Sequence, residues 1–362
     1  MDLPKSEESG NFPFFRVSFL FERRPNFIMQ LSRASLLALL CLAMPIAAAA
    51  AEPRANSGAP ERPRRPNLKL KTLGGMQFWS DVHFFHGWHI QQHSVTGHFR
   101  LLDANDVRHA WGTREECLAA LDAIRKEQDL PPMMGRAVIL VHGIVRSAHS
   151  MRPIRERLEA DGFYVVGFNY ASTRIDIPTA ADYLQQVVAS LEGIEEINFV
   201  VHSMGGLVVR AYLANHHEEC HRRLVMLGVP NLGAKLAQDL KNNWLFKFVS
   251  GPAGQQLNND PQGFIAALPT PDCEFAVIAG CRGTLDGYNP LVPGDDDGTV
   301  AVTSTMLPGA ADFMTVRRLH SFLMSDPEVV ESTHCFLTTG KLRADADPQP
   351  IPKKEAEPTP AE

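Results

Sequence analysis

From residue 137 onward the chain alternates between short apolar runs and longer stretches with helical spacing of apolar positions. Short continuous apolar runs are typical of strands buried on both faces of a parallel sheet. Such runs lie at residues 137–141, 164–169, 197–201, 224–227, 275–279 and 313–316, and helical stretches at 149–161, 179–191 and 204–215. Because parallel strands need crossover connections, the pattern predicts an α/β fold with a mostly parallel sheet and helices on both faces.

Residues 69–130 follow a different pattern, with short extended pieces and turn signals ahead of one helical stretch. The extended pieces lie near residues 76–79 and 98–102, and residues 114–127 have helical spacing. Thr113 and Glu116 have the spacing of a capping box, which satisfies free backbone N–H groups at a helix start. We predict a small N-terminal β-hairpin and helix packed on the α/β domain.

We place the α/β domain at residues 131–343 and expect it to contain an insertion at residues 232–270. The insertion interrupts the alternation and carries more large apolar side chains than a surface loop needs. These are Leu236, Leu240, Trp244, Leu245, Phe246 and Phe248. We interpret the insertion as a cap over an apolar site, and the alternative is a helix lying on the core.

Both ends of the chain differ in composition from the middle. Residues 29–51 combine a short basic start with an alanine- and leucine-rich run, which is the pattern of a signal peptide cleaved near residues 49–51. We therefore expect residues 1–28 to be an upstream extension and the protein to be exported to the periplasm or secreted, with an uncleaved membrane anchor as the alternative. The proline-rich segments 52–68 and 344–362 are predicted to be a disordered linker and a disordered tail.

Composition limits the partners of this protein. The 362 residues include 35 Lys and Arg against 41 Asp and Glu, so the formal net charge is −6. No basic run is long enough for a nucleic-acid surface, so we expect no nucleic-acid partner and a neutral or apolar substrate. The histidines of the N-terminal part match no zinc-site spacing and have no cysteine among them, so we expect no metal. They are His83, His86, His89, His93 and His98.

Ser203 interrupts an apolar stretch at the point where the strand pattern gives way to a helical one. Residues 198–210 read N-F-V-V-H-S-M-G-G-L-V-V-R. A strand, a tight turn and a helix within a few residues expose the serine hydroxyl above the sheet, as in the nucleophile elbow G-x-S-x-G. Gly205 keeps the last glycine of that pattern, and Val201 replaces the first. The alternative is a serine that only caps a helix.

A serine nucleophile needs donors for the oxyanion that forms during its attack on a carbonyl. His142 and Gly143 follow the first apolar run, and the glycine permits a turn that presents the N–H of Ile144. The N–H of Met204, directly after the serine, is the second candidate donor. We expect His142, Gly143 and Gly205 to support this turn.

Candidates for the acid and the base follow the serine in the chain. Asp297 precedes a glycine in the loop after the fifth apolar run, and Asp296 is its rival. His320 follows the last apolar run. His334 is the alternative base, although it shares a helix face with apolar residues. The order Ser203, Asp297, His320 is the one that α/β-hydrolases use.

Taken together, these motifs resemble those of bacterial lipases and esterases of the α/β-hydrolase superfamily. The resemblance covers residues 135–343, and it implies a Ser–His–Asp triad, an acyl-enzyme intermediate and no cofactor. It rests on V-I-L-V-H-G-I at 138–144, V-V-H-S-M-G-G-L at 200–207, G-V-P-N-L-G at 228–233, D-D-G-T-V at 296–300 and the region of His320. Asn231 and Ala234 stand where many lipases have the histidine and serine of a P-H-x-G-S motif.

We therefore expect a serine hydrolase that cleaves small-molecule or lipid carboxylic esters, with transient contact with a membrane or lipid interface. Ser203 is expected to attack the carbonyl, His320 to carry the proton, and Asp297 to orient the imidazole. Two alternatives stay open. One is an acyltransferase that uses the same triad, and the other is a non-catalytic binding protein with an α/β-hydrolase fold.

Overall fold

The computed structural model describes most of the chain after the N-terminal segments. It covers residues 69–72, 77–217, 220–240, 244–258 and 260–353. The predicted extension 1–28, signal peptide 29–51 and linker 52–68 lie outside the described residues. Among the described residues, no helix combines the length and apolar character that a membrane span requires.

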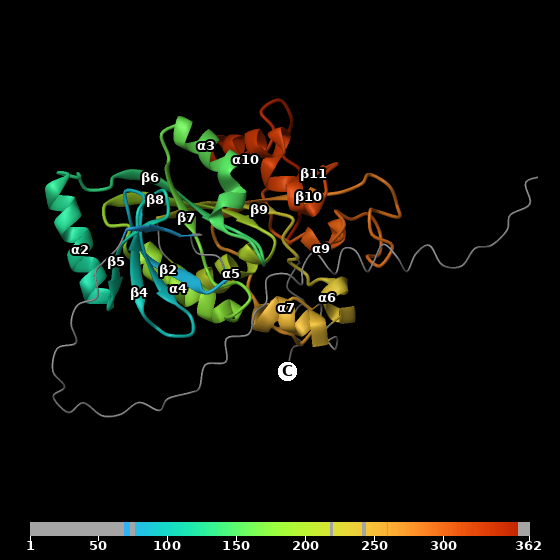
Figure 1. The fold of residues 1–362 in the computed structure, drawn as a ribbon. Helices are drawn as coiled ribbons and strands as arrows, with labels where there is room; N and C mark the ends of the chain where they lie inside the picture. Colours follow the sequence, from blue (N-terminus) through green and yellow to red (C-terminus); the bar gives the residue numbers. More distant parts are fainter. Residues whose placement is uncertain (1–68, 73–76, 218–219, 241–243, 259, 354–362) are drawn as a thin grey trace, which may run out of the picture. The chain divides into compact units, whose positions relative to one another are not determined.

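The core of the molecule is a six-stranded sheet with the order β11-β10-β9-β8-β6-β7, in which every neighbouring pair is parallel (Figure 1). Each strand coincides with one predicted apolar run, which confirms the predicted α/β fold. Because the strands are parallel, their carboxyl ends meet at one edge. The strands are β6 (Gly135–Val141), β7 (Tyr164–Phe168), β8 (Ile194–His202), β9 (His221–Leu227), β10 (Glu274–Gly280) and β11 (Asp312–Val316).

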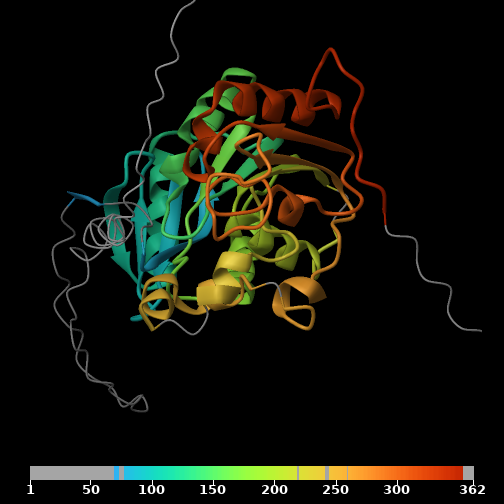
Figure 2. The same cartoon turned by 90° about the vertical axis from the view of Figure 1, so that its right-hand side faces the viewer.

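Helices cover both faces of this sheet, as predicted (Figure 2). One face packs on α3 (Arg152–Ala160) and α10 (Pro327–Thr339), and the other on α4 (Ile177–Ala189) and α5 (Met204–Leu213). Alternate residues of one strand serve the two cores. Leu140 of β6 belongs to the first core and Ile139 to the second. Burial on both faces explains why the strands read as continuous apolar runs.

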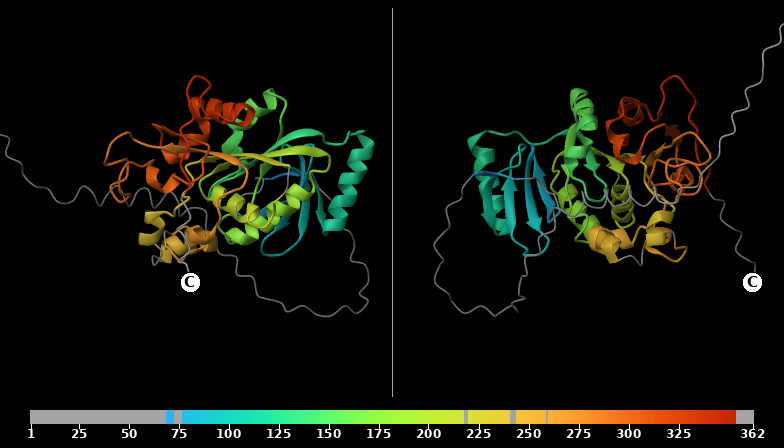
Figure 3. Two further views of the ribbon diagram at one scale, coloured as in Figure 1. Left: turned by 180° about the vertical axis from the view of Figure 1, so that it is seen from behind. Right: turned by 45° about the vertical axis from the view of Figure 1, so that its right-hand side comes forward.

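The N-terminal part is larger than the predicted hairpin and helix. It forms a five-stranded antiparallel sheet with the order β1-β5-β4-β3-β2, and α2 (Arg114–Glu127) packs on it (Figure 3). Its apolar pattern is interrupted because one face buries Asp81, Gln91 and Arg100, which bond to one another. The strands are β1 (Leu70–Lys71), β2 (Trp79–Phe85), β3 (Trp88–His93), β4 (Phe99–Leu102) and β5 (Val107–Gly112).

The helix α2 begins as predicted. The Thr113 side chain accepts from the Glu116 N–H, and the Glu116 carboxylate accepts from the Thr113 N–H, which together form the capping box. A capping box satisfies two N–H groups that a helix start otherwise leaves unpaired.

The insertion forms α6 (Lys235–Leu240), α7 (Trp244–Gln255) and α8 (Phe264–Ala267). Parts of it pack on the core, since Ala253 and Ile265 are buried and Gln256 accepts a hydrogen bond of 2.8 Å from the Ile177 N–H. The apolar side chains between residues 236 and 248 that suggested a cap lie outside the described part of the chain. A capping role for the insertion therefore stays a prediction.

The start of the C-terminal tail is ordered, which corrects the prediction of disorder for its residues 344–353. Gly309 and Ile351 pair through a backbone hydrogen bond of 2.8 Å, and Asp312 accepts the Gln349 N–H at 2.8 Å. Ile351 also packs against the hydrophobic core. One apolar anchor and one buried carboxylate thus hold a segment whose composition is typical of disorder. Residues 354–362 lie outside the described residues.

Candidate active site

Ser203 lies in a strained turn between the end of β8 and the start of α5. Its backbone has φ 54° and ψ −129°, a conformation that residues other than glycine rarely adopt. Two glycines allow α5 to begin this close to the sheet. A Cβ on Gly205 would lie 2.5 Å from the carbonyl oxygen of Val141, and a Cβ on Gly206 would lie 2.4 Å from Val229. Such strain persists where packing over-determines it, and it is typical of catalytic turns.

The structure brings together the three predicted triad residues, which lie far apart in the sequence. His320 Nε2 is 2.9 Å from Ser203 Oγ, and His320 Nδ1 is 2.6 Å from Asp297 Oδ2. Ser203, His320 and Asp297 are 8%, 9% and 1% exposed. All three residues are therefore largely buried, and Asp297 is the most deeply buried of them, which suits an orienting acid behind a nucleophile and a base.

The two rival residues have other partners. The carboxylate of Asp296 accepts the N–H groups of Asn289 at 3.1 Å and of Gly298 at 2.6 Å, so it stabilises its own loop. His334 lies on α10 with its Nε2 3.1 Å from Asp161 Oδ2, and it contacts Arg157 of α3. Neither residue lies within hydrogen-bond distance of Ser203 or His320.

Asp297 is fixed by its own turn. Its Oδ1 accepts the N–H groups of Thr299 at 3.0 Å and of Val300 at 2.8 Å, which leaves Oδ2 for the histidine. Its backbone carbonyl accepts the His320 N–H at 2.8 Å. The acid therefore holds the base through both side chain and backbone.

Two further residues that sequence reasoning did not assign shape the position of the histidine. His202 Nε2 donates to the carbonyl oxygen of His320 at 3.0 Å. Burial, and secondarily the neighbouring His320, hold the pKa of His202 well below its ordinary value, so His202 stays neutral. Gly228 has φ 56°, and a Cβ there would lie 3.1 Å from His320 Nδ1 and 3.2 Å from Asp297 Oδ2. Both roles depend on contacts between distant segments, which no local motif reveals.

The predicted oxyanion donors belong to the residue after Ser203 and to a loop that approaches Ser203. Within the part of the chain that the structure describes, the N–H groups of Ile144 and Met204 donate to no other residue. Gly143 brings the first of these loops close, since a Cβ there would lie 3.0 Å from the Cβ of Ser203. Two free backbone donors beside a candidate nucleophile can stabilise a developing oxyanion.

His142 supports this loop without acting as a base. Its ring stacks on Tyr170, with centroids 4.5 Å apart, and its Nδ1 donates to the Gly143 carbonyl at 2.8 Å. Burial lowers the pKa of His142 to about 4, so the ring is neutral near pH 7. The Tyr170 hydroxyl donates to the His142 carbonyl at 2.8 Å and fixes the end of β6.

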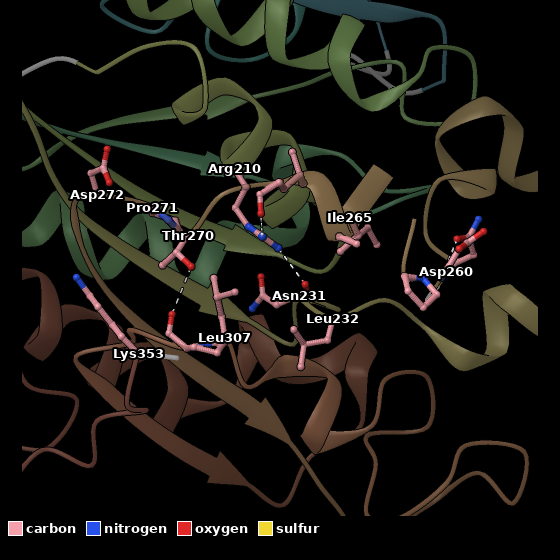
Figure 4. Close-up of a pocket in the computed structure, with 15 residues that line it drawn as sticks. Arg210, Asn231, Leu232, Asp260, Ile265, Thr270, Pro271, Asp272, Leu307 and Lys353 are labelled. Carbon is pink, nitrogen blue, oxygen red and sulfur yellow. Dashed lines mark hydrogen bonds between the residues drawn. The ribbon is translucent and has the colours of Figure 1, made fainter. Parts of the chain in front are cut away.

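A cavity of about 670 Å³ lies elsewhere, between the end of α5 and the insertion (Figure 4). The guanidinium of Arg210 lines it and donates to the carbonyls of Asn231 at 3.0 Å and Leu268 at 2.7 Å. None of the three triad residues lines this cavity. Arg210 therefore joins the segments around the cavity, and the cavity is separate from the candidate active site.

Comparisons with known proteins give matches of limited extent. A family model described as a domain of unknown function (DUF7379) matches residues 103–268, and no curated protein matches. The mature lipase BlEst2 of Bacillus licheniformis is similar in structure, with 17% identity, a TM-score of 0.44, and coverage of 57% of this chain and 92% of that chain. A gene product of Listeria innocua has 19% identity, a TM-score of 0.42, and coverage of 60% and 98%.

A third similar structure is a metagenomic carboxyl esterase, MGS0156, with 18% identity, a TM-score of 0.40, and coverage of 52% of this chain and 65% of that chain.

The fold of the present chain is clear from its own geometry. In a parallel sheet with helices on both faces, the strained strand-to-helix turn at Ser203 and the chain order serine, aspartate, histidine of the bonded residues are those of α/β-hydrolases. The chain therefore has the α/β-hydrolase fold.

Proposed function

We propose that this protein is a serine hydrolase that cleaves carboxylic esters through an acyl-enzyme intermediate. One observation carries the proposal, namely the continuous chain of hydrogen bonds from Ser203 through His320 to Asp297 at the top of a strained elbow. This arrangement deprotonates a hydroxyl that is otherwise a weak nucleophile. The free N–H groups of Ile144 and Met204 add the donors that acyl transfer requires.

The proposed reaction has two halves. Ser203 Oγ attacks the ester carbonyl while His320 Nε2 takes its proton, and the N–H groups of Ile144 and Met204 bind the oxyanion. The imidazolium, stabilised by Asp297, then gives its proton to the departing alcohol and leaves an acyl group on the serine. Water repeats the same steps, with His320 as the base, and releases the carboxylic acid.

A fluorophosphonate probe tests the nucleophile directly. We expect the probe to label the wild-type protein at Ser203, to leave Ser203→Ala unlabelled, and to label Ser325→Ala normally, since the hydroxyl of that exposed serine donates to the Phe322 carbonyl and is not part of the hydrogen-bond chain of the triad. Hydrolysis of p-nitrophenyl esters of increasing chain length should be lost in the same variant. Equal labelling of wild type and Ser203→Ala, or ester hydrolysis that survives this substitution, would refute the proposal.

The surroundings of the site support an apolar or lipid ester as the substrate. Most of the large apolar side chains that are exposed in the described residues lie on loops at the carboxyl edge of the sheet, where the triad also lies. They are Val145, Leu232, Leu285, Tyr288, Leu291, Leu319 and Phe322. Exposed apolar groups on segments at the same edge of the sheet as the site favour contact with an apolar surface. We therefore include transient docking on a lipid interface in the proposed function.

We call the seven exposed apolar residues named above the rim. Charged substitutions in the rim distinguish an effect on docking to a lipid surface from an effect on ester hydrolysis itself. We expect Leu285→Glu and Phe322→Glu, at positions 91% and 55% exposed, to lower hydrolysis of emulsified long-chain esters by about tenfold, because each charge opposes transfer to an apolar surface. Hydrolysis of a dissolved short-chain ester should stay within about twofold of wild type. Val95→Glu, at a position 65% exposed in the turn between β3 and β4, is the matched control. If Leu285→Glu and Phe322→Glu hydrolyse the emulsified ester as fast as Val95→Glu, docking through the rim is excluded.

A further inference from the structure

We infer that the N-terminal antiparallel sheet positions the oxyanion hole, and that Asp81 and Ser172 are the positioning residues through which it acts. The inference rests on the proposed hydrolase function. It concerns the loop at residues 143–148, which carries the Ile144 donor, and the segment at residues 169–172, which lies between that loop and β2.

The loop with the candidate donor is strained directly after Ile144. Val145 has φ 58°, a strained conformation that a β-branched residue rarely adopts. Its N–H donates to Ser172 Oγ at 3.1 Å, and Ser172 is 2% exposed. Because this bond fixes the peptide group that follows Ile144, it helps to hold the strained turn in one conformation.

The same segment holds the other end of the loop. Asn169 Oδ1 accepts the N–H of Ala148 at 2.9 Å, at the start of η1 (Ala148–Met151). The loop is therefore attached to the segment 169–172 at both Val145 and Ala148. Any shift of this segment changes where the Ile144 N–H points.

The N-terminal sheet fixes the segment in turn. Asp81 Oδ2 accepts the Asn169 N–H at 2.6 Å, and the Asp81 N–H donates to the Asn169 carbonyl at 2.9 Å. Next to it, Ser80 Oγ accepts the Ala171 N–H at 3.1 Å. Ser80 and Asp81 are 0% and 2% exposed, so these bonds form away from competing water. Two residues of β2 thus hold the segment that holds the oxyanion loop.

The carboxylate of Asp81 is itself held in place. Its Oδ1 accepts Gln91 Nε2 at 2.8 Å and lies 3.1 Å from His89 Nδ1. Burial opposes the charged form of His89, but the charges of Asp81 and Asp106, the hydrogen bond to Asp81 and a bond to the Asp103 backbone together outweigh burial, and the pKa of His89 is raised. Both oxygens of Asp81 therefore face donors. An amide at this position places an NH2 group against a donor in either orientation, so Asp81→Asn disturbs the contact without changing the size of the side chain.

Steady-state kinetics of Asp81→Asn and Ser172→Ala test the inference. We expect kcat for a dissolved p-nitrophenyl ester to fall by about 10- to 100-fold in each variant, while KM changes less than about threefold, because a misplaced oxyanion donor affects the transition state more than the substrate. The affinity for a trifluoromethyl ketone, which forms an oxyanion adduct with the serine, should fall in parallel with kcat.

Asp103→Asn is the matched control. Asp103 lies in the turn between β4 and β5 of the same sheet. Its carboxylate accepts His109 Nε2 at 2.9 Å and the N–H groups of Asn105 and Val107, and it bonds to no residue of the segment 169–172. It should lower the melting temperature without changing kcat or the inhibitor affinity of the folded protein. If Asp81→Asn and Ser172→Ala behave like Asp103→Asn, the sheet is only a scaffold and the inference is overturned.

Amide hydrogen exchange tests the coupling between the N-terminal sheet and the loop independently of ester hydrolysis. Peptides covering residues 143–148 should exchange faster in Asp81→Asn and Ser172→Ala than in wild type and Asp103→Asn, whether or not the protein hydrolyses esters. A wild-type protein without esterase activity would refute the proposed function, whereas unchanged exchange in both variants would refute the coupling between sheet and loop. Ser172→Ala removes only one oxygen atom, so it remains a test if Asp81→Asn fails to fold.

Discussion

Replacing His320 with alanine is expected to lower kcat for ester hydrolysis by about 10⁶-fold, the effect of removing the base from a Ser–His–Asp triad. The expectation follows from the position of His320 Nε2, 2.9 Å from Ser203 Oγ, and from the lack of a second base within reach of that hydroxyl among the described residues. His202 and His142 both lie nearby, but both rings are buried and use their N–H groups on backbone carbonyls.

His334→Ala is the matched control, because His334 pairs with Asp161 at the C-terminal end of α3 and should leave kcat within about twofold of wild type. The residues of a triad act as a unit, so the double variant Ser203→Ala, His320→Ala should be no slower than either single variant. Stopped assays with active-site titration measure both effects. A His320→Ala protein that keeps more than about 1% of the wild-type kcat would remove His320 from the proposed mechanism.

Much of the fold was predictable from the sequence because helices cover both faces of the parallel sheet. Strands buried on both faces contain short continuous apolar runs, such as residues 137–141 in β6 and 199–201 in β8, and these runs stand out in the sequence. The N-terminal strands do not stand out in this way, because Asp81 and Gln91 occupy buried positions and form a hydrogen bond with each other. A buried polar network looks like exposed surface when only hydrophobicity is considered. The sequence did not predict that the tail around Ile351 is ordered, because a single apolar residue in a proline-rich segment does not form a recognisable pattern.

The candidate site was predictable as far as its chemistry is local. The elbow at Ser203 and the glycine turn at residue 143 are short motifs at the ends of strands. The contacts that position them are not local. Asp81 and Asn169 are 88 residues apart, and His202 and His320 are 118 residues apart. No single-sequence pattern specifies such pairs. The adjacent residues Asp296 and Asp297 differ in the N–H groups that their carboxylates accept and in that only Asp297 of the two bonds to His320. The sequence alone does not show this difference.

Asp297→Asn is expected to lower kcat by about 10⁴-fold with little change in structure. The amide oxygen can keep the bonds from the N–H groups of Thr299 and Val300, so its NH2 group takes the place of Oδ2 and faces His320 Nδ1. The ring must then accept at Nδ1 and carry its proton on Nε2. In that tautomer Nε2 has no lone pair for the proton of Ser203, and the imidazolium loses its neighbouring charge.

The adjacent Asp296→Asn makes the comparison decisive. Asp296 is fully buried and accepts backbone N–H groups of its own loop, so its replacement should lower the melting temperature while kcat stays within about fivefold of wild type. Thermal unfolding and kcat measured on the same preparations distinguish the two residues. The reverse pattern, with the large loss of kcat at Asp296, would transfer the orienting role to that carboxylate and would require its loop to rearrange when substrate binds.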